Sequence, residues 1–265
     1  MPPHIYPEVS FVRVDIATPL RLIGDFFALA ADTARGLFVL PFQWREFVDQ
    51  SWFIVRVSLV PTFLVALPLT ALVSFTLNIL TSEFGASDTS GAGATLGSVT
   101  QVGPIVTVLI VAGAGATAIC ADLGSRTIRE EIDAMEVLGI DPVHRLIVPR
   151  VLASTTVALL LNALVCAIGI IGGFFFSVFL QNVTPGAFVA GIPLLTGLPE
   201  LLISEIKAGA FGLIAALVAC YRGLSVRGGP KSVGQAVNET VVYSFMALFV
   251  VNVVLTAIGV KATAG

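Results

Sequence analysis

The chain has 265 residues, of which 56% are hydrophobic and only 12% are charged, and its mean hydropathy is +0.97. Soluble domains carry about 25% charged residues, so this chain has too few to cover a soluble fold, and we expect lipid to contact much of its surface. The net charge of −3 excludes a basic field for nucleic acid, and the three widely spaced cysteines form neither a disulfide framework nor a metal motif.

The first predicted element is an amphipathic helix over residues 10–48. Apolar residues, beginning with Ile16, Leu20 and Ile23, recur at spacings of three and four with charged residues between them. This pattern is typical of a helix that lies in the membrane interface. A helix packed on a partner protein has the same pattern, so both interpretations stay open.

Five long apolar runs follow, and each meets the requirement of about 20 residues for a helix that crosses hydrocarbon. They cover residues 53–80, 102–123, 151–180, 198–221 and 241–260. Pro61 and Pro68 lie on one face of the first run and should bend its helix. Gly113 and Gly115 give the second run a small surface for close helix packing. The predicted fold class is therefore all-α, a polytopic membrane protein.

The basic residues predict the orientation of these runs. Twelve of the 14 Lys and Arg residues precede or begin the first run, or lie in the connections after the second and fourth runs. The connections at residues 81–100 and 181–197 contain neither Lys nor Arg, and their Gly, Ser, Thr and Pro content predicts short caps. Because basic residues concentrate on the cytoplasmic side, we expect a cytoplasmic N-terminus and a C-terminus outside the inner membrane.

The connection after the second run predicts a short cytoplasmic helix over residues 126–139. One stripe at helical spacing is apolar: Ile128, Ile132, Met135 and Leu138. The other face is charged: Arg129, Glu130, Asp133 and Glu136. Gly139 is a natural helix stop, and Asp141-Pro142 prevents continuation. Such a helix suits either a cytosolic partner or the membrane surface, and periodicity does not distinguish the two.

The stretch IREEIDAMEVLGIDP at residues 128–142, followed by VPRVL at 148–152, closely resembles the MlaE/YrbE family. Members of this family are the permeases of MCE (mammalian cell entry) lipid transporters. The stretches at residues 102–113 and 207–212 fit the same family. The resemblance covers nearly the whole chain, which is therefore expected to form a single permease domain over residues 1–265.

The resemblance implies a permease subunit that moves lipids across the inner membrane in an ATP-driven complex, importing fatty or mycolic acids, or sterols. The cytoplasmic helix would be the coupling helix that docks on a dimeric ABC ATPase. Its expected coupling residues are Ile128, Arg129, Glu130, Glu131, Ile132, Asp133, Met135, Glu136, Leu138, Gly139, Asp141 and Pro142. An assembly of MCE proteins would continue the lipid path outside the membrane.

We expect this chain to be no enzyme and to bind no cofactor or metal, with ATP and Mg²⁺ on the separate ATPase. A stretch near residue 230 partly matches the sequence motif of a phosphate-binding loop. Pro230 stands directly before Lys231, however, where that motif needs glycine.

Three departures from the family pattern concern ionisable positions. The family often has Glu, Arg and Asp at the positions of Gln101, Ala114 and Asn252. The absence of these three ionisable side chains suggests a paralogue most like the actinobacterial YrbE A type, which works beside a different permease. We therefore expect a heterodimer with a second YrbE-type subunit.

Five residues in or beside the apolar runs are candidates for lining a lipid cavity: Pro61, Pro68, Gln101, Lys207 and Asn252. Gln101 and Asn252 either line the cavity or bond across helices. Lys207 lies about 13 Å along its helix from Leu198, where a charge is costly and marks a functional candidate. If the helix enters the membrane later, Lys207 snorkels outward instead. A self-contained channel or secondary transporter is the alternative function, since such proteins also use intramembrane charges.

Overall fold

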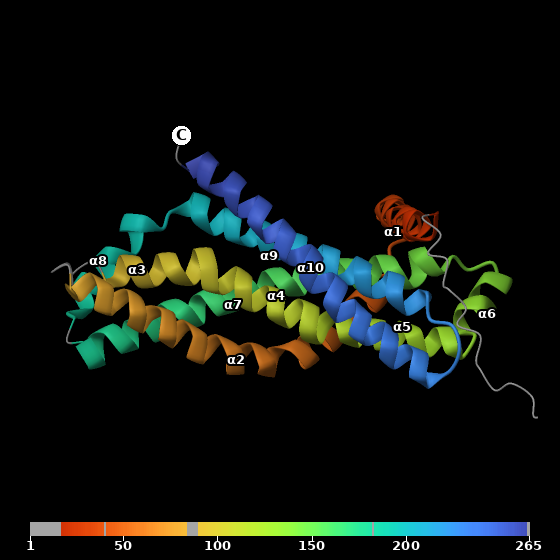
Figure 1. Ribbon diagram of the computed structural model, residues 1–265, viewed down its shortest axis with the longest axis horizontal. Helices are drawn as coiled ribbons and strands as arrows, with labels where there is room; N and C mark the ends of the chain where they lie inside the picture. The colour runs from red at the N-terminus through yellow and green to blue at the C-terminus, as the bar shows by residue number, and fades with distance from the viewer. Residues whose placement is uncertain (1–16, 40, 84–89, 182, 264–265) are drawn as a thin grey trace, which may run out of the picture.

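The computed structural model describes residues 17–39, 41–83, 90–181 and 183–263. The regular structure in this part of the chain is helical, without strands, and five helical segments are long and apolar enough to cross a membrane. These segments form one elongated bundle (Figure 1). The predicted all-α, polytopic fold class is confirmed.

The helices in chain order are α1 (Ala17–Gly36), α2 (Trp44–Glu83), α3 (Ser90–Gly97), α4 (Gly103–Ile110), α5 (Ala116–Ile128), α6 (Glu131–Val137), α7 (Val148–Gln181), α8 (Pro185–Leu195), α9 (Leu198–Leu224) and α10 (Pro230–Thr263). The π-helical turns Ser98–Val102 and Val111–Gly115 join α3, α4 and α5 into one spanning segment, and Val143–Ile147 leads into α7. Each of the five predicted runs lies inside one of the resulting long helical segments, which extend beyond the predicted limits.

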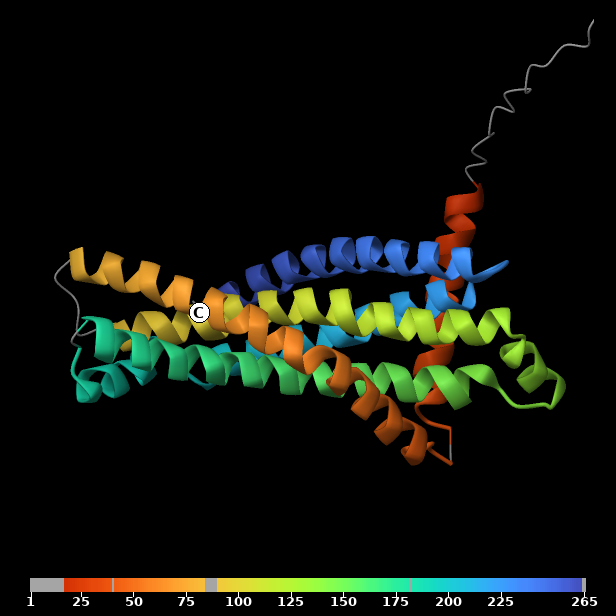
Figure 2. The ribbon, with the colours of Figure 1, turned by 90° about the horizontal axis from the view of Figure 1, so that it is seen from below.

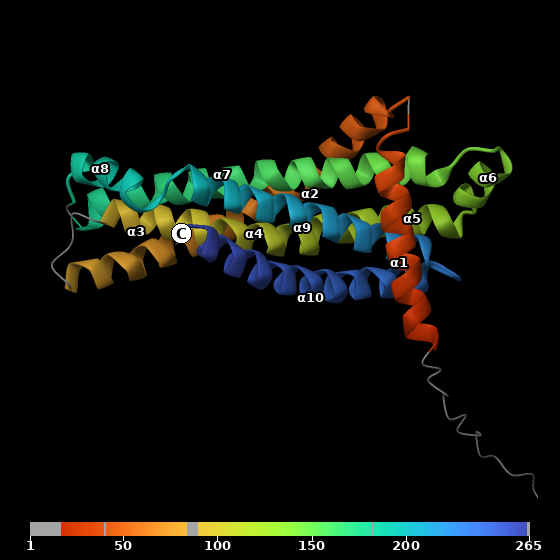
Figure 3. The same ribbon diagram turned by 90° about the horizontal axis from the view of Figure 1, so that it is seen from above.

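The bundle has two distinct ends. We call them the α6 end, where α6 connects α5 to α7, and the α8 end, where α8 connects α7 to α9 (Figure 1). Near the α6 end, α1 lies across the bundle rather than along it (Figure 3), and it packs on α9 and on the start of α7. A helix in this orientation lies parallel to the membrane surface when the bundle spans the membrane.

The structure corrects the predicted helix over residues 10–48. Residues 10–16 lie outside the described part of the chain, and α1 ends at Gly36. A new helix, α2, begins at Trp44, so residues 44–48 belong to the first spanning helix. Pro41, which cannot continue a helix, lies in the break. Gly36 lets the end of α1 approach α7 closely, since a Cβ there would come within 2.7 Å of Val148 Cγ2.

The two connections predicted to be short caps are largely helical. Residues 84–89 lie outside the described part of the chain, but helix resumes at Ser90 as α3. The small residues there allow close packing on α8, since a Cβ on Gly91 would lie 2.1 Å from the Phe188 carbonyl oxygen. In the other connection, Thr184 caps α8 by accepting a hydrogen bond from the Ala187 N–H at 3.3 Å.

Both prolines of the first run lie near the middle of the 40-residue helix α2, which continues through them. Figure 2 shows that α2 changes direction about halfway along its length. Pro removes a backbone donor and crowds the preceding turn, which is the usual cause of such a change. The axis of α2 therefore points in different directions in the half near the α8 end and the half near the α6 end.

The closest helix approaches do not involve the glycines that the sequence suggested. A Cβ on Gly113 would have no neighbour within 4 Å, and one on Gly115 would make only ordinary contacts with α2, at 3.8 Å or more. One close approach between spanning helices is that of α7 and α9, where a Cβ on Gly212 would lie 2.7 Å from both Ala158 Cβ and the Ser154 carbonyl oxygen. Ser154 Oγ also donates a hydrogen bond of 3.1 Å to the Gly212 carbonyl.

We expect Gly212→Val to destabilise the protein, because the new side chain would collide with the backbone of α7 rather than with a flexible side-chain tip. Overpacking of this kind costs about 3 kcal/mol. Thermal unfolding in detergent should show a clearly lower midpoint for this variant. Gly113→Val is the matched control and should unfold close to the parent protein; equal midpoints for the two variants would contradict the assignment of close packing to Gly212.

Candidate functional site

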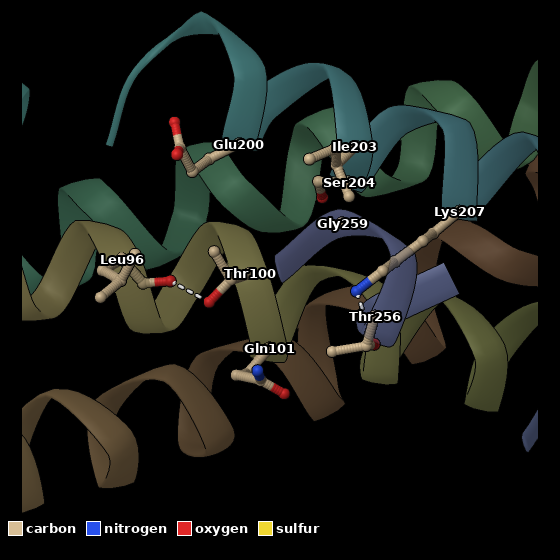
Figure 4. Close-up of a pocket in the computed structure, with 9 residues that line it drawn as sticks. All are labelled: Leu96, Thr100, Gln101, Glu200, Ile203, Ser204, Lys207, Thr256 and Gly259. Atoms are coloured by element: carbon tan, nitrogen blue, oxygen red, sulfur yellow. Dashed lines mark hydrogen bonds between the residues drawn. The ribbon is translucent and has the colours of Figure 1, made fainter. Parts of the chain in front are cut away.

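A cavity with several polar side chains in its wall lies toward the α8 end, between the α3–α4 junction, α9 and α10 (Figure 4). Its volume is about 250 Å³. Nine residues line it: Leu96, Thr100, Gln101, Glu200, Ile203, Ser204, Lys207, Thr256 and Gly259. Both Gln101 and Lys207 were predicted as cavity candidates, and the fold brings them to this one cavity.

Lys207 provides the basic group of this cavity. Its side chain is only 4% exposed, and its Nζ donates a hydrogen bond of 2.9 Å to Thr256 Oγ1 (Figure 4). Thr256 in turn donates to the Asn252 carbonyl oxygen at 2.6 Å. The side chain therefore points across to α10 and does not snorkel along its own helix toward the interface.

Glu205, two residues from Lys207, faces a different helix. Asn162 Nδ2 on α7 donates hydrogen bonds of 3.0 Å both to Glu205 Oε1 and to Ser204 Oγ. Thr107 Oγ1 on α4 completes the cluster with a hydrogen bond of 3.4 Å to Asn162 Oδ1. Glu205 is therefore held on the side of α9 that faces α7, and the acidic side chain that lines the cavity with Lys207 is Glu200.

The remaining cavity candidates lie elsewhere. Asn252 lines a separate, mainly apolar pocket of about 130 Å³ between α4 and α10, beside Ile105 and Phe249. Pro61 and Pro68 line neither of these two cavities. The structure therefore joins two of the five candidates and separates the other three.

Several lining residues were missed from the sequence. Ser204 lies three residues before Lys207 and Thr256 four residues after Asn252, so each shares a helix face with a chosen candidate. That spacing was a usable signal. Glu200 lies four residues before Ser204, so it shares the same face of α9. Thr100 had no such signal, because its position depends on where the π-helical turn at Ser98–Val102 lies.

The second candidate site is the surface around α6. The predicted helix over residues 126–139 is broken, because α5 continues to Ile128 and Glu130 adopts a left-handed conformation with φ of 58°. The shorter α6 then runs from Glu131 to Val137. Gly139 follows with φ of 74°, as its predicted role as a helix stop requires.

The apolar stripe of this segment divides into a packed part and an exposed part. Ile132 is buried, and Ile128 and Met135 pack against the core. Leu138, predicted to share that stripe, is 74% exposed, because the chain turns at the end of α6. Val137 is 87% exposed beside it. We call Val137, Leu138 and Ile140 the α6 apolar surface; all three are exposed. Helix α6 lies at the extremity of the molecule (Figure 1).

Ion pairs connect α6 to the spanning helices. Arg150 at the start of α7 is fully buried, and its Nη2 lies 2.6 Å from Asp122 Oδ2 on α5. Arg126 pairs with Asp122 at 3.3 Å and with Glu131 of α6 at 3.8 Å. Glu46 of α2 lies 3.9 Å from Arg150 Nη1. These charges connect α2, α5, α6 and α7 in one network.

Within the described residues, no group of three or more His, Cys, Asp or Glu side chains is placed to hold a metal ion. The three cysteines are buried free thiols. The cavity offers one buried amine with hydroxyl, amide and carboxylate groups, and the α6 apolar surface lies outside the bundle.

A family model described as permease MlaE matches residues 47–258. A probable ABC transporter permease of Synechocystis sp. is 32% identical over 173 residues, which cover 65% of this chain and 66% of that protein. The intermembrane phospholipid transport system permease protein MlaE of Haemophilus influenzae is 29% identical over 177 residues, or 66% of this chain and 68% of that protein. The chloroplastic protein TRIGALACTOSYLDIACYLGLYCEROL 1 of Arabidopsis thaliana is 28% identical over 157 residues, 59% of this chain and 45% of that protein.

Proposed function

The chain belongs to the MlaE family of permeases, and from this premise we propose that it is the membrane subunit of an ATP-driven lipid transporter. The observation that carries the proposal is the α6 apolar surface of Val137, Leu138 and Ile140, exposed at the end of the bundle. Such a surface on a short helix between two spanning helices suits a protein partner. The partner is a dimeric ABC ATPase, which binds ATP and Mg²⁺ and docks on this surface.

The proposed cargo is a lipid, and the cavity around Lys207 supports this assignment. A buried amine beside hydroxyl and amide groups can bind the anionic end of a lipid, while the neighbouring apolar surfaces accept its chains. One relative is named for phospholipid transport. We propose inward transport of fatty or mycolic acids, or of sterols, by this chain.

A second permease completes the proposed membrane unit. The outer faces of α2 and α10 carry many exposed apolar side chains, including Leu64, Leu72, Met246, Phe249 and Val253. We propose that a YrbE-type partner packs beside such a face and that this chain is the A-type member of the pair. The pocket at Asn252 lies on the same side of α10 as Phe249 and would then be closed by the partner.

We propose that the α6 end faces the cytoplasm. The basic residues of the chain support this orientation, since Arg126, Arg145 and Arg227 lie in segments at the α6 end. The N-terminus is then cytoplasmic and the C-terminus lies outside the inner membrane. The α8 end faces the MCE-protein assembly.

The proposal is tested by purifying the complex on a tag placed on this chain, after co-expression with the second permease, the ATPase and the MCE proteins. We expect the ATPase to co-purify, and lipid added to the reconstituted complex should stimulate ATP hydrolysis. ATP-dependent movement of a fluorescent lipid across the liposome membrane is the second readout. If the chain is recovered without an ATPase and lipid movement does not depend on ATP, the proposal is rejected in favour of a self-contained channel.

We expect Lys207→Met in this complex to slow lipid transport about tenfold, the effect of losing one charge-assisted hydrogen bond of about 1.5 kcal/mol. Met keeps the length and packing of the side chain, so the folded protein should be as stable as the parent or more stable. The rate of lipid movement and the thermal midpoint are measured on the same preparations. An unchanged rate would show that the amine does not contact the cargo.

A further inference from the structure

A large apolar groove lies beneath α1, where α1 crosses α9 and α10. Its volume is about 500 Å³, which is within the range of about 300–1,000 Å³ that ligand pockets occupy. Its walls are apolar and aromatic side chains, including Ile23, Phe27, Ile214, Val218 and Ala247. It shares no lining residue with the cavity around Lys207.

The walls of this groove are held in place by aromatic contacts. Phe26 of α1 packs edge-to-face on Tyr221 of α9 with ring centroids 5.9 Å apart. Arg222 lies over the Tyr243 ring of α10, with its guanidinium carbon 5.6 Å from the ring centroid. The groove is therefore built from three helices, and its polar end is at Arg222.

Arg222 also lines a second pocket, which is polar. This pocket has a volume of about 220 Å³ and includes Ser225, Arg227, Ser232 and Gln235. One arginine therefore stands between an apolar groove and a pocket of hydrogen-bonding groups. An amphiphile, with its chain in the groove and its head in the polar pocket, matches this arrangement.

The charges at the polar end favour an anionic head. Arg222 and Arg227 are the basic groups that line the polar pocket, and Glu239 is the acidic one. Glu239 is ion-paired with Arg222 and accepts a hydrogen bond from Gln235 Nε2 at 3.1 Å. Arg222 Nε is buried and has no hydrogen-bond partner. Because a guanidinium has five N–H donors, one carboxylate leaves donors free for a phosphate.

We propose that the groove under α1 binds an anionic membrane phospholipid, with one acyl chain among Ile23, Phe27 and Ala247 and the phosphate at Arg222. The position suits this ligand, since an interfacial helix lies at headgroup depth and basic pockets between spanning helices bind anionic headgroups. This lipid is a bound component that ties α1 to α9 and α10, separate from any transported lipid. The inference requires only that the chain lies in a membrane.

Thermal unfolding of the purified chain in neutral detergent tests the proposal, with phosphatidylglycerol and phosphatidylcholine of identical acyl chains as probes. A ligand that binds only the folded state raises the midpoint, by about 5 °C at a hundredfold excess over its Kd. We expect phosphatidylglycerol to raise the midpoint by about this amount and phosphatidylcholine to raise it less. Equal effects of the two lipids on the parent protein would overturn the assignment of the headgroup site.

Substitutions in the groove and in the polar pocket test the acyl-chain site and the headgroup site separately. Ala247→Trp fills the groove and should abolish the effect of both lipids; Val218→Phe serves the same purpose if the tryptophan variant does not fold. The pair Arg222→Gln with Glu239→Gln leaves no unpaired carboxylate and should remove only the preference for phosphatidylglycerol. Leu160→Trp, on the exposed face of α7, is the control and should respond like the parent.

Two results would contradict the groove as the binding place. One is a groove-filling variant that still responds to phosphatidylglycerol as the parent does. The other is cross-linking of a Phe27→Cys variant to another subunit of the assembled transporter, since the occupant would then be a protein.

Discussion

Replacing Val137 and Leu138 by aspartate should release the ATPase from the complex and abolish lipid-stimulated ATP hydrolysis, while the permease itself stays folded. Both side chains are almost fully exposed, so the substitutions remove no packing inside the chain. Burying two such side chains in an interface contributes about 3 kcal/mol, and a desolvated carboxylate adds a further cost. We therefore expect the affinity for the ATPase to fall about 100-fold or more.

The measurement is the amount of ATPase that co-purifies with the tagged chain, together with the hydrolysis rate of the reconstituted complex. Gly234→Asp with Asn238→Asp is the matched control, since it adds the same charge at two exposed positions of α10 near the α6 end. The control should keep the ATPase. If the α6 variant keeps it as well, Val137 and Leu138 form no part of the docking surface.

The structure changes which residues of this segment are suitable for the test. Met135 and Glu131 belong to the predicted coupling set, but Met135 packs against the core and Glu131 pairs with Arg126 and Arg129. Substituting them would disturb the fold as well as the docking surface. The exposed pair separates the two effects.

Asp122→Asn should have the largest effect on stability among single substitutions at the α6 end. Asp122 accepts a charge-assisted hydrogen bond of 2.6 Å from Arg150, whose side chain is fully buried. Removing the carboxylate leaves a buried guanidinium with the more distant Glu46, at 3.9 Å, as its remaining counter-charge, and breaking a buried pair costs about 3–5 kcal/mol. Asp122 is partly exposed, so water offsets some of that loss, and we expect about 3 kcal/mol.

Thermal unfolding of the purified chain in detergent measures this effect. Asp133→Asn, an exposed carboxylate on α6, is the control and should have almost no effect. The double variant Asp122→Leu with Arg150→Met should be more stable than Asp122→Asn alone, because it removes both charges together. If Asp122→Asn unfolds at the same temperature as the parent protein, the Asp122–Arg150 pair does not stabilise this end of the bundle.

The sequence predicted the spanning helices well, because about 20 consecutive apolar residues leave few other folds available. It also predicted the turn at Gly139, where a left-handed backbone favours glycine. It failed where small or weakly polar residues had two possible roles. Gly91 and its neighbours have the composition of a loop, but they form a helix because small residues allow α3 to approach α8 closely.

The candidate site was predicted in part. The sequence identified Lys207 as a costly charge in an apolar run, but it left open whether the amine is buried or reaches the interface. The hydrogen bond to Thr256, 49 residues away, decides the question. Likewise, nothing in the sequence pairs Asp122 with Arg150, which lie 28 residues apart.

The sequence by itself determined that lipid contacts much of the surface of this protein, how many helices are long enough to span a membrane, and the family to which the chain belongs. Composition and run length are sufficient for the first two, because backbone polar groups in lipid must be paired and an apolar run of about 20 residues pairs them by forming a helix. Only the tertiary structure decided which apolar faces are covered, as the burial of Ile132 and the exposure of Leu138 show. Helical periodicity locates an apolar face, but lipid, a partner protein or the protein core can each cover such a face. Contacts between segments that are distant in the sequence decide which of the three covers it.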